Sequence, residues 1–202
     1  MAKFVAISGP AQTGKTSLVD YLSIYPETSG VVFSPDLYNT VWSNLVDQGI
    51  FSSYDEIVRD SDFICVYLIK VLEYYEEYLE KYKDTDHLVF LDCCWVDLLT
   101  YSMVSMWCSR AILDLQAEMI ERIVKFRDSV DRIYITEYDE SKVVKQKFRS
   151  DHKIYSVKGN RTIELQYYEV FKNLKNAIAL DTSDQTEAAL FIIRDLQNLG
   201  YL

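Results

Sequence analysis

The pattern with the most specific chemical meaning lies near the start of the chain. Residues 9–16 read Gly-Pro-Ala-Gln-Thr-Gly-Lys-Thr and match the phosphate-loop pattern GxxxxGK[ST] at every fixed position. Gly9 and Gly14 permit backbone conformations that turn successive N–H groups toward phosphate oxygens. Lys15 can then reach the β- and γ-phosphates of ATP, and the Thr16 hydroxyl can bind Mg²⁺. The predicted nucleotide-binding residues are Gly9, Pro10, Ala11, Gln12, Thr13, Gly14, Lys15, Thr16 and Ser17, and Lys15 is also predicted to be catalytic.

A metal ion beside such a loop needs an anionic ligand, and the chain supplies one at the end of an apolar run. Residues 88–92 read Leu-Val-Phe-Leu-Asp, four apolar residues followed by a carboxylate, which is the Walker-B pattern. We therefore predict that Thr16 and Asp92 hold Mg²⁺ together. The alternative is that Asp92 only caps the helix that follows it.

The segments around these residues alternate between two types. Short apolar runs predict five strands, at residues 4–8, 31–33, 88–91, 133–136 and 177–180. Helical spacing of apolar residues predicts helices at 16–22, 37–46, from 53 to about 82, 97–107, 111–126, 162–173 and 186–197. This alternation predicts an α/β fold of the P-loop NTPase type, with a parallel five-stranded sheet between two layers of helices. The chain has no internal repeat and no Pro/Gly/Ser-rich linker, so residues 1–202 are expected to form one domain.

Capping residues predict where two of these helices begin. Ser34 and Pro35 suit an N-cap and a first helical turn ahead of residues 37–46. Ser53 and Glu56 form a capping-box pair ahead of the long helix. Along that helix four tyrosines recur at helical spacing, which favours core packing over a wall that stacks on a base. They are Tyr67, Tyr74, Tyr78 and Tyr82.

The chain is acidic overall, but its charge is uneven. It has 31 acidic and 21 basic residues and a net charge of −10, which disfavours broad binding of nucleic acid. Residues 142–161 are the exception, with seven basic side chains and one acidic side chain. Such a cluster is either a solvated surface or the contact for an anionic group.

Composition disfavours several other classes of protein. Cys65, Cys93, Cys94 and Cys108 show no CxxC spacing and are accompanied by only two histidines, so we expect free buried thiols and no zinc site. No run reaches the roughly 18 apolar residues of a membrane span, and no leader precedes the first strand. We therefore expect a cytoplasmic protein without a membrane partner.

Beyond the phosphate loop, three segments make the chain resemble the P-loop nucleoside and nucleotide kinases, the thymidylate-kinase-like and deoxynucleoside-kinase-like group. Residues 35–36, followed by Trp42, resemble the acidic acceptor-site segment of deoxynucleoside kinases. Residues 92–101 resemble the segment after their third strand, and residues 177–184 resemble their last strand and adenine-side loop. The resemblance implies a phosphotransferase that uses ATP and Mg²⁺ on a nucleoside, nucleotide or similar small metabolite. It also suggests a homodimer and, in Trp42 and Tyr101, the aromatics of the acceptor pocket.

The same resemblance implies catalytic roles in other parts of the chain. In these kinases a basic lid lies between the fourth strand and the final helices and closes over the triphosphate, and residues 139–162 occupy that place. Arg149 and Arg161 are the expected catalytic arginines, since a guanidinium can neutralise charge on the transferred phosphoryl group. Asp36 is expected to orient an acceptor hydroxyl or take its proton. The alternative for Asp36 is an acid in a first helical turn, favoured by the helix dipole.

One departure from the group concerns the acceptor. The related kinases usually carry Asp-Arg or Glu-Arg where this chain has Asp92 and Cys93, and a cysteine cannot replace an arginine that contacts phosphate. Either Arg59, Arg110 or a lid arginine substitutes for it, or the acceptor is bound differently. The departure weakens the case for a monophosphate acceptor.

Two other functions stay open at this point. A kinase of modified bases or ends in DNA, as some phage enzymes are, would use residues 142–161 to contact DNA, although the net charge argues against this. A P-loop ATPase or nucleotide sensor would act on a partner protein and would hydrolyse or bind ATP without transferring phosphate. The sequence offers no second motif for such a partner.

Overall fold

The predicted parallel sheet is present in the computed structural model, which describes residues 1–10, 13–52, 61–106, 113–137, 165–170 and 172–202. Its strands are β1 (Lys3–Ser8), β2 (Val32–Phe33), β3 (Leu88–Asp92), β4 (Arg132–Thr136) and β5 (Ala177–Leu180). They form one sheet in the order β2-β3-β1-β4-β5, and every neighbouring pair is parallel.

The helices agree with the predicted ones to within a few residues where the structure describes them. They are α1 (Lys15–Ser23), α2 (Leu37–Asp47), α4 (Ser61–Tyr82), α5 (Trp95–Met106), α6 (Leu113–Lys125) and α9 (Gln185–Asn198), with a short 3₁₀ turn, η1, at Pro26–Thr28. Of the helix predicted at 162–173, residues 165–170 are described and are helical. No helix in the described part of the chain is long and apolar enough to cross a membrane.

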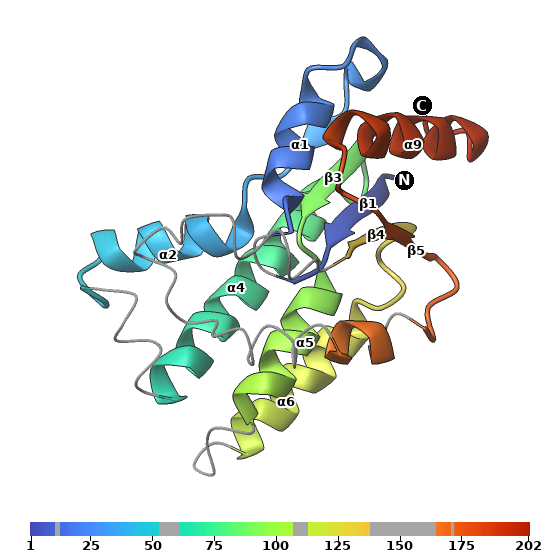
Figure 1. The fold of residues 1–202 in the computed structure, drawn as a ribbon. Helices are drawn as coiled ribbons and strands as arrows, with labels where there is room; N and C mark the ends of the chain where they lie inside the picture. The colour runs from blue at the N-terminus through green and yellow to red at the C-terminus, as the bar shows by residue number, and fades with distance from the viewer. Residues whose placement is uncertain (11–12, 53–60, 107–112, 138–164, 171) are drawn as a thin grey trace.

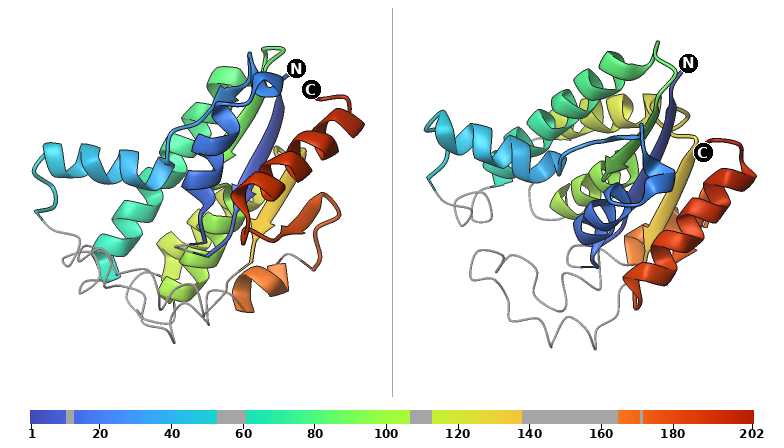
Figure 2. Two further views of the ribbon diagram at one scale, coloured as in Figure 1. Left: turned by 45° about the horizontal axis from the view of Figure 1, so that its top comes forward. Right: turned by 90° about the horizontal axis from the view of Figure 1, so that it is seen from above.

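Helices cover both faces of the sheet because side chains alternate between its two sides. Along β1, Phe4 and Ala6 pack into one core, and Val5 and Ile7 pack into the other. The first core lies under α2, α4, α5 and α6, while α1 and α9 cover the second (Figures 1 and 2). The three-layer α/β/α architecture predicted from the sequence is therefore confirmed.

The connections that follow β1 and β3 diverge at the carboxyl edge of the sheet. The chain leaves β1 for α1 on one face, whereas it leaves β3 for α5 on the opposite face (Figure 1). Ligands of open α/β sheets bind where neighbouring connections diverge in this way. The register places Ile7 beside Asp92 across the two strands, so the phosphate loop and Asp92 start next to each other.

The predicted N-cap of α2 is wrong, although the helix covers the predicted residues 37–46. Its N-cap is Asp36, whose carboxylate accepts a hydrogen bond from the Asn39 N–H (3.1 Å), and the helix begins at Leu37 rather than at Pro35. Aspartate is as good an N-cap residue as serine, so Asp36, which directly precedes the helix, takes the N-cap position. Ser34 accepts a hydrogen bond from the Asp92 N–H instead (2.9 Å), which ties the end of β2 to the end of β3. The capping box predicted at Ser53 and Glu56 lies outside the described residues.

Candidate functional site

The loop after β1 needs a glycine at both of its predicted glycine positions. Gly9 has φ 141°, and a Cβ atom there would lie 2.1 Å from the Thr136 hydroxyl oxygen on β4. Gly14 has φ 87°, is the N-cap of α1, and would place a Cβ 2.9 Å from the Gln185 side chain. Only glycine adopts these conformations without strain and leaves this much room. The backbone of the loop therefore packs directly against β4 and the start of α9.

Hydrogen bonds from β4 and from the segment after β5 hold the loop in place. The Thr136 hydroxyl on β4 donates to the Ser8 carbonyl (3.1 Å), and the Thr182 hydroxyl after β5 donates to the Thr13 carbonyl (2.9 Å). The Thr13 hydroxyl donates to the Pro10 carbonyl, which closes the loop on itself (2.8 Å). Ala11 and Gln12, which were also predicted to bind nucleotide, lie outside the described residues.

Lys15 lies across this loop. Its Nζ donates to the carbonyls of Gly9 and Pro10, each at 2.8 Å. The positive charge of Lys15 thus lies over the first half of the loop. The backbone N–H groups of the loop are expected to bind phosphate oxygens there. A bound phosphate would offer this amine charged acceptors in place of the two carbonyls.

The first turn of α1 adds unused N–H groups at the same place. The Leu18 N–H makes the first hydrogen bond within the helix, to the Gly14 carbonyl (2.9 Å). The N–H groups of Lys15, Thr16 and Ser17 precede it and have no acceptor inside the helix. Such a helix start attracts anions through these donors and through the helix dipole.

Thr16 and Asp92, the predicted metal ligands, are in direct contact. The Thr16 hydroxyl donates to Oδ2 of Asp92 at 2.7 Å, and Asp92 is 1% exposed. Burial raises the pKa of the Asp92 carboxyl to about 6, although the Thr16 hydrogen bond and the Lys15 charge oppose the rise.

The same pair fits Mg²⁺ by its chemistry. A hydroxyl and a single carboxylate are typical of nucleotide-bound Mg²⁺, which takes few ligands from the protein and completes its shell with phosphate oxygens and water. The described residues contain no group of three or more His, Cys, Asp or Glu side chains that could hold a metal alone. The pair would hold Mg²⁺ together with phosphate oxygens and water.

Asp36 lies near this pair but has a partner of its own. Its two carboxylate oxygens accept from the N–H and the side-chain amide of Asn39. Its charge contributes to the raised pKa of Asp92, after burial, and Ser34, two residues before it, accepts a hydrogen bond from the Asp92 N–H. The structure thus gives Asp36 an N-cap role, and its predicted role toward an acceptor stays a prediction.

Cys93 occupies the position where the resembling kinases carry an arginine. Its N–H donates to the Ile7 carbonyl (3.0 Å), and its φ of 77° turns the chain from β3 toward α5. Burial, followed by the charges of Asp97 and Asp92, raises the pKa of the Cys93 thiol, so the group stays protonated and neutral. Arg59 and Arg110, the suggested substitutes for the missing arginine, lie outside the described residues.

Sequence reasoning missed Asp97, which the structure places beneath the loop. Its side chain is fully buried and accepts hydrogen bonds from Ser8 and Gly9, at the end of β1. The available signal was an acid inside the apolar run that opens α5, three residues after the helix cap at Cys94.

The aromatic residues pack mainly with one another. Trp42 stacks on Phe51 with ring centres 6.0 Å apart, and Tyr101 meets Tyr38 edge-on at 5.5 Å. Their predicted role in an acceptor pocket stays a prediction. The tyrosine stripe of α4 packs in or against the core below α2, α4 and α5, as predicted for Tyr67, Tyr74, Tyr78 and Tyr82.

The predicted lid lies outside the part of the chain that the structure describes. This applies to residues 139–162 as a whole and to the two expected catalytic arginines, Arg149 and Arg161. Their roles therefore stay predictions. Tyr167, in the helical segment that follows, is described and is 2% exposed.

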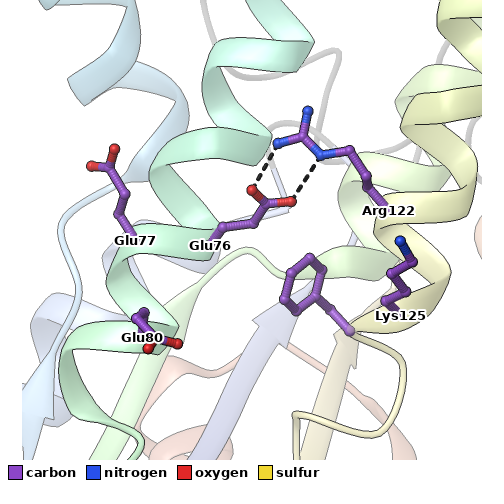
Figure 3. A pocket seen from close by; sticks show the side chains of 6 residues that line it. Glu76, Glu77, Glu80, Arg122 and Lys125 are labelled. Atoms are coloured by element: carbon purple, nitrogen blue, oxygen red, sulfur yellow. Dashed lines mark hydrogen bonds and ion pairs between the residues drawn. The ribbon is translucent and has the colours of Figure 1, made fainter.

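A shallow cavity of about 500 Å³ lies between α4 and α6, away from the phosphate loop (Figure 3). Its lining residues are Glu76, Glu77, Glu80, Arg122, Lys125 and Phe126. Arg122 bridges the two helices by a pair of hydrogen bonds to Glu76 (3.0 and 2.7 Å). The end of α4 directly precedes β3, so this cavity lies at the amino edge of the sheet, opposite the predicted site.

Solved structures with the same arrangement include nucleoside and nucleotide kinases. A deoxyadenosine kinase from M. mycoides with bound dATP matches with a TM-score of 0.65 and 15% identity, over 96% of this chain and 99% of that one. A thymidylate kinase from Ehrlichia chaffeensis matches with a TM-score of 0.63 and 13% identity, over 96% of this chain and 98% of that one. A thymidylate kinase from Candida albicans matches with a TM-score of 0.66 and 10% identity, over 99% of this chain and 93% of that one. This chain has the P-loop nucleoside/nucleotide kinase fold.

At this level of identity the likeness is one of fold. No family model and no curated protein sequence matches the chain. The P-loop kinase fold nevertheless extends over nearly the whole chain, as the resemblance in its motifs implied.

Proposed function

We propose that this chain transfers the γ-phosphoryl group of ATP, with Mg²⁺, to a nucleoside, nucleotide or similar small metabolite. The observation that carries the proposal is the 2.7 Å hydrogen bond from Thr16 to Asp92, next to Lys15 at the end of a complete phosphate loop. The kinase fold supports it, and one structure with this fold contains bound dATP.

The groups of the loop would bind and hold the triphosphate. The N–H groups at the start of α1 would donate to phosphate oxygens, and Lys15 would exchange the carbonyls of Gly9 and Pro10 for them. Held by Thr16 and Asp92, Mg²⁺ would draw negative charge from the β- and γ-phosphate oxygens. Positioning and charge neutralisation then account for most of the expected catalysis.

In the transfer step, an acceptor oxygen forms a bond to the γ-phosphorus while the bond from that phosphorus to the β–γ bridging oxygen breaks. ADP leaves with that oxygen, and a hydroxyl acceptor loses its proton to a base. We assign this proton to Asp36, whose carboxylate lies near Asp92 at the carboxyl edge of the sheet. Arg149 and Arg161 are assigned the remaining stabilisation of charge on the moving phosphoryl group.

The acceptor side of this site favours a hydroxyl over a phosphate. Asp36 and Asp92 place two acidic groups at the same edge of the sheet, and the neighbouring Cys93 is neutral. A doubly charged monophosphate would be repelled by the carboxylates unless a cation from another part of the chain compensated. A nucleoside or similar alcohol is therefore the acceptor expected first.

Mass spectrometry with an acceptor panel tests the proposal. The protein is incubated with ATP and Mg²⁺ together with nucleosides, nucleoside monophosphates, or DNA with ordinary or hydroxymethylated bases. Lys15→Ala is the inactive variant, and Lys3→Ala, at an ion pair with Asp131 at the amino end of β1, is its matched control. A phosphorylated small molecule that is lost only in Lys15→Ala supports the proposal. Phosphorylated DNA alone would indicate a DNA kinase instead, and the absence of any phosphorylated acceptor would contradict the proposal for this panel.

A further inference from the structure

A buried carboxylate beneath the phosphate loop has no part in the chemistry proposed above. Oδ1 of Asp97 accepts from the Gly9 N–H (3.2 Å) and from the Tyr167 hydroxyl (2.6 Å). Oδ2 accepts from the Cys94 N–H (2.7 Å) and from the Ser8 hydroxyl. Four donors fill the acceptor sites that a carboxylate has. Its position is therefore fixed by β1, the loop, the start of α5 and the helical segment 165–170 together.

Burying the carboxylate of Asp97 in the core costs free energy. Asp97 is 0% exposed, and the burial of a carboxylate is unfavourable unless every oxygen is satisfied. Its four hydrogen bonds come from hydroxyl and backbone N–H groups, and no basic side chain in the described residues bonds to it. An apolar side chain at this position would fill the core at a lower free-energy cost. The four donors around Asp97 indicate that this carboxylate orients them.

Gly9 is the residue of the phosphate loop whose N–H donates to this carboxylate. Its N–H donates to Asp97, while its carbonyl accepts from Lys15 Nζ on the other side of the chain (2.8 Å). When Lys15 turns to a phosphate, that carbonyl loses its partner. The hydrogen bond from the Gly9 N–H to Asp97 then remains to hold the Ser8–Gly9 peptide at the start of the loop, with Thr136 packed where a Cβ of residue 9 would be.

We infer that Asp97 is a positioning residue of the phosphate loop, and that the Tyr167 hydroxyl, by holding its carboxylate, raises the affinity for nucleotide from outside the loop. The effect on affinity rests on the proposed binding of ATP. Neither side chain is assigned a contact with the substrate. The pair acts through the orientation of the Gly9 peptide.

The test compares two tyrosines that each donate to a buried or half-buried aspartate. Tyr167→Phe removes the hydrogen bond to Asp97, and Tyr134→Phe removes one of similar length to Asp195, between β4 and α9 (2.7 Å). The dissociation constant for MgATP, KM for the acceptor and the free energy of unfolding are measured for both variants. Asp97→Asn is added because its amide would present N–H groups to N–H and O–H donors.

We expect the dissociation constant for MgATP to rise about threefold in Tyr167→Phe and about tenfold or more in Asp97→Asn. KM for the acceptor should stay unchanged in both, and Tyr134→Phe should bind MgATP as the unaltered protein does. If Asp97→Asn does not fold, Tyr167→Phe carries the test. Unchanged MgATP affinity in Tyr167→Phe, or an equal loss in Tyr134→Phe, would overturn the inference about affinity.

A second readout needs no nucleotide. Hydrogen exchange of the Gly9 amide, followed by NMR in the ligand-free protein, should be faster in Tyr167→Phe and unchanged in Tyr134→Phe. If the unaltered protein binds no ATP, the proposed function is wrong. The exchange of the Gly9 amide still tests whether Tyr167 and Asp97 hold the start of the loop in place. Equal protection of the Gly9 amide in all three proteins would refute the positioning role.

Discussion

The Thr16 hydroxyl donates a 2.7 Å hydrogen bond to Oδ2 of Asp92, which joins the first turn of α1 to the last residue of β3. The two residues are 76 positions apart in the chain. They meet because β1 and β3 are neighbours in register, so that the loop after β1 leads α1 back over the end of β3. The fold thus brings the two predicted metal ligands into direct contact.

The raised pKa of Asp92 predicts an unusual dependence of stability on pH. An unfolded aspartate titrates near pH 4, and in the folded, ligand-free protein the Asp92 carboxyl titrates at about 6. Between these values the folded state binds more protons than the unfolded state, so the Asp92 contribution to the free energy of unfolding falls as pH rises from about 4 to 6. Above pH 6 the buried charge of Asp92 lowers the free energy of unfolding by on the order of 1–3 kcal/mol.

Asp92→Asn should therefore be more stable than the unaltered protein at pH 7.5, by about 1–2 kcal/mol, with the difference shrinking toward pH 4. Urea unfolding of the ligand-free proteins across this range measures it. Asp195→Asn is the control of opposite sign, because Arg132 and Tyr134 outweigh burial and lower the pKa of the Asp195 carboxyl. A destabilised Asp92→Asn variant at pH 7.5 would show that the carboxylate stabilises the ligand-free fold.

A methyl group at Gly9 should disrupt the fold more than one at another glycine of positive φ. Gly9→Ala places a Cβ against Thr136, whereas a Cβ at Gly30, where φ is 91°, would have no heavy atom within 4 Å. We expect Gly30→Ala to lose about 1–2 kcal/mol of unfolding free energy through backbone strain alone. Gly9→Ala should lose about 3 kcal/mol or more, because the steric clash adds to the strain. Equal losses in urea unfolding would mean that β4 does not press on the loop.

The double role assigned to Asp36 can be separated with two substitutions. Asparagine caps a helix as well as aspartate does but is a poor base, so Asp36→Asn should keep the stability of α2 and lower turnover about a hundredfold or more. Its KM for ATP should change little. Asp36→Ala should lose similar turnover and, in addition, about 1 kcal/mol of unfolding free energy. Normal turnover in Asp36→Asn would leave the residue with its capping role alone.

Local sequence predicts the positions of some residues of the candidate site. The glycine and lysine spacing at 9–16 predicts a phosphate loop by itself, because each position has a separate geometric role. The contact of Asp92 with Thr16 follows from the parallel sheet, because the carboxyl ends of parallel strands meet at one edge. Helix ends were less certain: Ser34 was a reasonable cap, and only the structure shows that Asp36 takes that position and that Ser34 accepts from Asp92.

Asp97 could not be found in this way, because its importance depends on contacts between distant segments. Ser8 and Tyr167 lie 89 and 70 residues away from it in the chain. An acid in the first turn of a helix is ordinarily explained by the helix dipole, and its place in an apolar run does not indicate which donors surround it. Its role becomes visible only once the fold brings these donors to one point.

The stoichiometry of the products tests the central claim most directly. ADP, inorganic phosphate and phosphorylated acceptor are quantified together, with ATP, Mg²⁺ and each candidate acceptor in excess, for the unaltered protein and Lys15→Ala. If the chain is the proposed kinase, one phosphorylated acceptor forms for each ADP, free phosphate stays low, and the rate in Lys15→Ala falls about a hundredfold or more. ADP released with an equal amount of inorganic phosphate, and no phosphorylated acceptor, would contradict phosphoryl transfer and indicate an ATPase.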